Sequence, residues 1–156
     1  MDIDRYERTW IIISAVVLAG LFGVLLYSYY GQGIHLVTDA GQILPRDVRT
    51  TPPFDEPGLR QVGPDEYDLV MVAQAWVFTP RQVTIPAGST VNFRMTSADV
   101  IHGFKIPGTT INLMVIPGQV TEASYRFREP GEYLFVCHEY CGAGHHVMSG
   151  VITVEQ

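Results

Sequence analysis

An uncharged run of 21 residues, from Trp10 to Tyr30, constrains the fold of this chain most strongly. As an α-helix this run would be about 31 Å long, which matches the hydrocarbon thickness of a bilayer. Trp10 opens the run and three tyrosines close it, as aromatic side chains do at the two interfaces of a membrane. A buried helix of this length normally carries a polar stripe, and a cleaved signal peptide normally ends in a small-x-small site. We therefore expect residues 10–30 to form an uncleaved transmembrane helix.

Basic residues near this run predict its orientation. Arg5 and Arg8 precede it, whereas the next arginine after it is Arg46. The positive-inside rule then makes residues 1–9 a cytoplasmic segment and places the rest of the chain on the periplasmic or extracellular side of the plasma membrane. The formal net charge of -6 argues against nucleic acid as a partner, because phosphate binding needs a basic surface.

Residues 31–66 are predicted to be a connecting segment. Half of the ten prolines of the chain fall in it, together with several glycines. Proline removes a backbone donor and glycine loosens the chain, so regular structure is not expected here. A connection of this length is uncommon inside a compact domain, and we expect it to lie along the surface of another subunit.

Residues 67–156 are predicted to form an all-β domain. Short runs rich in β-forming residues alternate with turn signals such as Pro107-Gly108 and Pro117-Gly118, and no amphipathic helix is visible. This pattern favours an antiparallel sandwich or barrel. The expected strands are 68–78, 82–85, 90–96, 111–116, 120–127, 131–137 and 147–154.

Residues with metal-binding chemistry gather near the end of the chain. Both cysteines, three of the five histidines and Met148 lie between residues 137 and 148, and His102 lies between two expected strands. Methionine is a poor zinc ligand, whereas thiolate, imidazole and thioether together suit copper. Gly142 and Gly144 let this loop fold tightly enough to direct several side chains to one point.

Two kinds of copper site are compatible with these residues. In a mononuclear blue-copper site, one cysteine joins two histidines and a methionine, and Cys137 has no role. In a binuclear site, both thiolates bridge two copper ions, and each ion takes one imidazole and one weak ligand. The binuclear interpretation uses every candidate and lets two nearby thiolates share two cations, so we favour it.

Each candidate also has an ordinary structural interpretation. Cys137 and Cys141 could form a disulfide in an oxidising compartment, Met148 could fill the core, and His102 could be a loop histidine. The concentration of these residues in one short stretch weighs against all three. We expect His138 and His146 to point away from the site, because they neighbour ligating positions. His35 lies in the connecting segment and carries no signal.

The motif Cys-x-Glu-x-Cys-x3-His-x2-Met, preceded by Asp99-Val100-Ile101-His102, resembles the binuclear copper A site of cytochrome c oxidase subunit II. The resemblance extends to the anchor, the connecting segment, the Gln74-Ala75-Trp76 segment and the Pro-Gly-Glu-Tyr strand before the first cysteine. A single span and the residues Tyr6–Trp10 are similar to those of the ba-type, or B-family, oxidases.

The resemblance implies a fold, a cofactor and partners. The fold would be an all-β, cupredoxin-like Greek-key sandwich after one N-terminal transmembrane helix, and the cofactor would be two copper ions. The site would accept an electron from cytochrome c or a similar periplasmic donor. It would pass that electron to haem in oxidase subunit I, where oxygen is reduced and protons are translocated, so no catalytic residue is expected in this chain. The implied copper ligands are Cys137 and Cys141 as bridges, His102 and Met148 on one ion, and His145 and the Glu139 carbonyl on the other.

The resemblance suggests three further roles. Trp76 would lie where electrons enter, although a core tryptophan of the sandwich is an equally good interpretation. The Glu139 side chain would bind magnesium at the boundary with subunit I. Glu7 would lie at a cytoplasmic proton entrance, where the alternative is a solvated carboxylate at the membrane interface.

Two other functions are compatible with the sequence. A membrane-tethered mononuclear blue-copper protein would be an electron shuttle without an enzyme partner. A nitric oxide reductase subunit with the same copper motif would differ mainly in its partner. A copper chaperone of the thioredoxin-like kind would show a βαβ pattern, which this sequence lacks.

Overall fold

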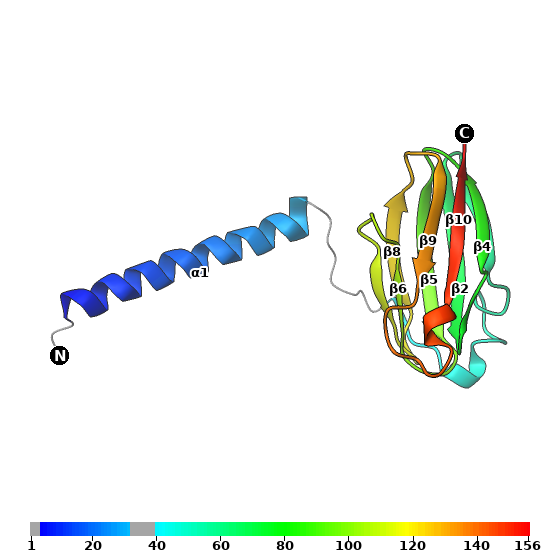
Figure 1. Ribbon diagram of the computed structural model, residues 1–156, viewed down its shortest axis with the longest axis horizontal. Helices are drawn as coiled ribbons and strands as arrows, with labels where there is room; N and C mark the ends of the chain where they lie inside the picture. Colours follow the sequence, from blue (N-terminus) through cyan, green and yellow to red (C-terminus); the bar gives the residue numbers. More distant parts are fainter. Residues whose placement is uncertain (1–3, 32–39) are drawn as a thin grey trace. The chain divides into compact units, whose positions relative to one another are not determined.

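The computed structural model describes residues 4–31 and 40–156. The predictions for residues 1–3 and for 32–39, including His35, lie outside this part of the chain. The described residues form two units, an N-terminal helix and a β domain (Figure 1).

Helix α1 spans Arg5–Gly31, so it begins before Trp10, where the uncharged run starts. Its apolar side chains are exposed along its whole length, and it is long and apolar enough to cross a membrane. Glu7 is exposed in the first turn, where a carboxylate interacts favourably with the helix dipole.

Two five-stranded sheets form the β domain (Figure 1). The first sheet has the order β1 (Gly58–Gly63), β2 (Glu66–Gln74), β5 (Thr90–Ser97) and β8 (Thr121–Arg126), with β3 (Val77–Thr79) paired to the end of β2. The second has the order β4 (Gln82–Pro86), β10 (Ser149–Glu155), β9 (Gly131–Val136), β6 (His102–Lys105) and β7 (Asn112–Val115).

The sheets are mixed rather than antiparallel throughout, which corrects the expectation. β2 pairs with β5 in parallel, and β4 pairs with β10 in parallel. Neighbouring parallel strands need a crossover connection. Between β2 and β5 the chain forms β4, which belongs to the second sheet, and this provides the crossover. Two short strands were also missed: β1, within the expected connecting segment, and β6, which begins with His102. The expected strand 68–78 is in fact two strands, β2 and β3, which are separated at Ala75 and Trp76 and pair with each other.

Phenylalanine rings fill the centre of the core. The ring of Phe104, on β6, lies 5.4 Å from that of Phe78, 5.7 Å from that of Phe93 and 5.1 Å from that of Phe135, centroid to centroid. All four side chains are buried. His102 precedes Phe104 by two positions and therefore shares its face of the strand. Packing of this phenylalanine thus directs His102 inward.

A second, smaller core lies between β2 and residues 43–54 of the expected connecting segment, which we call the proline-rich segment. Ile43, Val48 and Phe54 are buried and form one cluster with Val70 and Val72 of β2, together with Val120. Because Leu69 and Met71 belong to the main core, β2 is buried on both faces, which explains its continuous apolar sequence. Part of the expected connecting segment, from Ile43 to Phe54, therefore packs on the β domain of its own chain.

Candidate metal centre

The ends of β9 and β10 hold the loop that carries most of the candidate ligands. Cys137 follows β9, Met148 precedes β10, and the Cys137 amide donates to the Met148 carbonyl at 3.0 Å. Between them, Gly142 has a φ of +116°, a conformation that favours glycine. A short 3-10 helix, η2 (His145–Val147), completes the turn. The loop therefore reverses direction, and residues at its two ends become neighbours.

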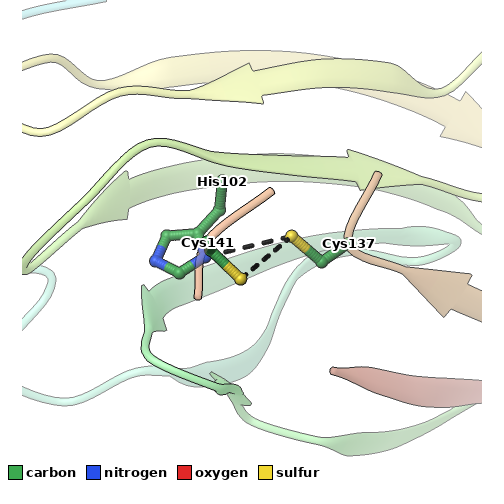
Figure 2. A group of neighbouring side chains, drawn as sticks. All are labelled: His102, Cys137 and Cys141. Atoms are coloured by element: carbon green, nitrogen blue, oxygen red, sulfur yellow. Dashed lines mark hydrogen bonds between the residues drawn. The ribbon is translucent and has the colours of Figure 1, made fainter. Parts of the chain in front are cut away.

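Figure 2 shows three of the side chains that meet here: His102, Cys137 and Cys141. Their ligand atoms all lie within 4.8 Å of one another, and all three residues are buried. The Cys137 Sγ is 3.9 Å from the His102 Nδ1 and 3.8 Å from the Cys141 Sγ. Both cysteines are free thiols, so the disulfide interpretation is wrong.

The remaining predicted ligands lie around the two thiols. The Cys141 Sγ is 3.6 Å from the His145 Nδ1 and 3.6 Å from the Met148 Sδ. The Cys137 thiol donates to the Glu139 carbonyl oxygen at 3.2 Å. The structure thus brings together all six positions that the sequence singled out, although His102 begins a strand and is not a loop histidine. Met148 is both a core residue and a neighbour of the Cys141 thiol.

The donor set fits a soft metal ion. Two thiols, two imidazole nitrogens, a thioether and a carbonyl surround one buried point, and this chemistry suits copper. The distance of 3.8 Å between the sulfurs is less than two metal–sulfur bonds of about 2.3 Å, so a single ion can contact both. Copper is therefore the metal that this cluster indicates.

His138 and His146 are exposed, as expected for residues that do not face the cluster. The ring of His138 lies against the backbone of β6. A Cβ built on Gly103 would lie 2.6 Å from three atoms of that ring. Because Gly103 has no side chain, the His138 ring fits against β6, outside the cluster.

Trp76 is not a core residue of the sandwich, because 45% of its surface is exposed. Its Nε1–H donates to the Cys141 carbonyl at 3.1 Å, and its ring lies against Gly142 and Gly144. A Cβ on Gly144 would lie 2.6 Å from atoms of the indole. The two glycines thus form a surface on which the indole rests, next to the backbone carbonyl of Cys141.

Asp99 borders the cluster, and the sequence analysis gave it no role beyond its place in the segment before His102. Its Oδ1 lies 2.8 Å from the His102 Nε2, and its Oδ2 accepts from the Ala75 amide at 2.7 Å. Burial alone would raise the pKa of Asp99, but the hydrogen bonds from His102, Ala75 and Val100 outweigh it and lower this pKa. A carboxylate three residues before a candidate histidine ligand is the signal that could have identified it.

Burial raises the pKa of the Cys141 thiol to about 11, and the hydrogen bond and charge of the neighbouring Cys137 add to this effect. A thiol with a raised pKa holds its proton at neutral pH in the metal-free protein. Metal binding must therefore displace that proton.

Alkylation of Cys141 in the metal-free full chain should still accelerate above pH 9. The thiolate is the reactive form, and below the pKa its fraction rises about tenfold for each pH unit. We expect the rate to rise about tenfold from pH 9 to pH 10, followed by mass spectrometry of the labelled Cys141 peptide. Glutathione serves as the freely exposed control. A rate for Cys141 that levels off near pH 9 would contradict the raised pKa.

Comparison with known proteins finds one family. The model of the cytochrome C oxidase subunit II periplasmic domain matches residues 65–155. A cytochrome c oxidase subunit 2 of Thermus thermophilus is 35% identical over 155 residues, covering 97% of this chain and 92% of that relative. A second Thermus thermophilus cytochrome c oxidase subunit 2 is 41% identical over 114 residues, covering 72% of this chain and 84% of its own length.

Solved structures agree with these matches. One chain of a heme-copper terminal oxidase dimer, determined by cryo-electron microscopy, superposes with a TM-score of 0.82 at 35% identity and covers 97% of this chain and 100% of its own length. The periplasmic domain of subunit II of cytochrome oxidase from Bradyrhizobium japonicum gives a TM-score of 0.53 at 22% identity, over 57% of this chain and 83% of that domain. The latter likeness concerns the fold alone, and the two-sheet domain is the cupredoxin-like sandwich that the motif implied.

Proposed function

Because this chain belongs to the cytochrome c oxidase subunit II family, we propose that it is the subunit through which electrons enter a haem-copper oxidase. The observation that carries the proposal is the meeting of four other donor groups around the two free thiols of Cys137 and Cys141, which makes six donors in all. These groups come from two separate parts of the chain, and the fold makes one buried site of them.

We propose that the site holds two copper ions bridged by Cys137 and Cys141. His102 and Met148 would serve one ion, and His145 and the Glu139 carbonyl the other. The surroundings of the two thiols support two ions, because each thiol has an imidazole nitrogen and a weaker donor as near neighbours: His102 and the Glu139 carbonyl at Cys137, and His145 and Met148 at Cys141. The pairing of ligands on each ion is the one that the family motif implies. A mononuclear site would leave Cys137 unused, although it lies as deep in the cluster as Cys141.

Copper bound here would accept one electron at a time and release it to a second centre. The protein's own part is to hold the ligands still and exclude water. His102, Met148 and both cysteines are buried, and the base of the loop is fixed by the hydrogen bond between Cys137 and Met148. A rigid, dry ligand set changes little when the charge of the site changes, so electron transfer needs little reorganisation.

We propose cytochrome c, or a similar periplasmic protein, as the electron donor, and Trp76 as the residue where electrons enter. Trp76 is half-exposed, and its indole is one hydrogen bond from the backbone of Cys141. Beyond residue 30 the chain carries 13 acidic and 8 basic residues, a balance that helps to steer a basic donor.

The partner that receives the electron is the haem-bearing subunit I of the oxidase. Helix α1 anchors the chain in the membrane beside that subunit. We propose that its N-terminus is cytoplasmic and that the β domain lies on the periplasmic or extracellular side, because Arg5 and Arg8 precede the span. Oxygen reduction and proton translocation would take place in the partner.

Two carboxylates have proposed roles at the borders of the chain. The Glu139 side chain, half-buried beside the ligand loop, would bind magnesium at the boundary with subunit I. Glu7, exposed in the first turn of α1, would lie at the cytoplasmic proton entrance.

A Glu139→Gln oxidase should lose magnesium, and a Glu7→Gln oxidase should take up protons more slowly. Unchanged metal content or unchanged proton uptake would refute the respective role.

Two variants of the assembled oxidase test the function. Cys141→Ser removes a bridging thiolate, so copper content of the β domain and oxidation of cytochrome c should both be lost. Trp76→Leu should leave the copper content intact and lower kcat/KM for cytochrome c severalfold, measured by stopped-flow and steady-state absorbance. Val77→Ala, beside Trp76 and also exposed, is the matched control.

Full cytochrome c turnover in Cys141→Ser would contradict the proposed function, and full turnover in Trp76→Leu would remove only the role of that residue. Turnover with nitric oxide but not with oxygen would place the chain in a nitric oxide reductase. If the chain bound one copper ion and carried electrons without a subunit I, it would instead be a membrane-tethered blue-copper protein.

A further inference from the structure

Asp99 uses both of its carboxylate oxygens on groups that border the metal centre. Its Oδ1 lies 2.8 Å from the His102 Nε2 and accepts the Val100 amide at 2.6 Å. Its Oδ2 accepts the Ala75 amide at 2.7 Å. One side chain therefore joins a metal-facing histidine on β6 to the segment between β2 and β3.

The contact with Oδ1 selects one tautomer of His102. Both Asp99 oxygens already accept backbone amides, Oδ1 from Val100 and Oδ2 from Ala75. An oxygen placed as an acceptor pairs with a donor, which assigns the proton to the His102 Nε2. A neutral imidazole has one protonated nitrogen, and its Nδ1 is then free to act as a ligand. That Nδ1 is the atom that lies 3.9 Å from the Cys137 Sγ.

The contact with Oδ2 continues to the other thiol. Ala75 is followed by Trp76, whose Nε1–H donates to the Cys141 carbonyl at 3.1 Å. A chain of contacts thus runs from His102, through Asp99, to Trp76 and on to the loop of Cys141.

Two hydrogen bonds hold the loop that carries Asp99 in place. Ser97 is buried, and its hydroxyl donates to the Val100 carbonyl across the turn. The Ala98 amide donates to the Ala73 carbonyl at 3.0 Å, which ties the turn to the end of β2. Because its loop is held in this way, the Asp99 carboxylate is fixed in position and can orient His102 and Ala75.

We propose that Asp99 is the positioning residue of the metal centre, which holds His102 in the Nε2–H tautomer and holds Trp76 against the Cys141 loop. The proposal rests on the proposed copper site for its functional meaning. Its structural part concerns the metal-free chain and is testable without copper.

The first test is nuclear magnetic resonance of the metal-free full chain in detergent micelles, with nitrogen-15 in histidine and tryptophan. In the unmodified chain the His102 Nε2 should be protonated and its Nδ1 unprotonated. In Asp99→Ala, His102 should become a mixture of tautomers, and the Trp76 indole proton should exchange faster with solvent. Asp65→Asn, an exposed acid of the same domain that loses the same charge, is the control and should change neither signal.

Asp99→Asn separates the two contacts if the alanine variant does not fold. An amide has one acceptor oxygen, so it can serve His102 or Ala75 but not both. At least one of the two signals should therefore change. Retention of both signals in Asp99→Ala, or in Asp99→Asn where the alanine variant is unfolded, would overturn the proposal.

Copper retention gives the second readout. We expect the Asp99 variants to bind copper roughly 10- to 100-fold more weakly than the unmodified chain in competition with a chromophoric chelator, as for other residues that orient a ligating histidine. Unchanged affinity in both Asp99 variants would overturn the proposal. Failure of the unmodified chain to bind copper would instead contradict the proposed function and leave the tautomer result standing.

Discussion

The antiparallel pairing of β9 with β10 is the constraint on which the site depends. The last pair of this ladder joins Val136 to Ser149, and the hydrogen bond between Cys137 and Met148 extends it by one step. This closes the base of the loop, so two ligands that are distant in the loop become neighbours in space. The left-handed Gly142 and the turn η2 then return Cys141 and His145 over that base. Strand pairing and loop geometry together bring the candidate ligands between Cys137 and Met148 to one place.

The sandwich supplies what this stretch cannot provide for itself. β6 is only a short strand, yet Phe104 anchors it in the aromatic core, and His102 on the same face is thereby brought to the thiols. On the other side, the proline-rich segment covers the outer face of β2, the strand that leads into Trp76. Asp99 connects these two supports. The core, the covering segment and the site are therefore mechanically linked parts of one small domain.

The sequence predicted which candidate side chains cluster better than it predicted the strands that position them. Cys137, Cys141, His145 and Met148 are close in sequence, so their chemistry was recognisable without any knowledge of the fold. β6 was missed because it is short and begins with a histidine, and β1 because it lies among prolines and glycines. The two parallel pairings depend on which sheet each strand joins, and local sequence does not encode that choice. Asp99 was missed because its partners, Ala75 and His102, meet only in the folded domain.

The most direct test of the central claim is an electron paramagnetic resonance spectrum of the copper-loaded full chain in detergent, recorded together with its metal content. We predict two copper ions per chain and hyperfine structure from one unpaired electron shared equally between two copper nuclei. That result requires both Cys137 and Cys141 as bridges. One copper ion per chain, with the simpler pattern of an electron localised on a single nucleus, would contradict the binuclear site.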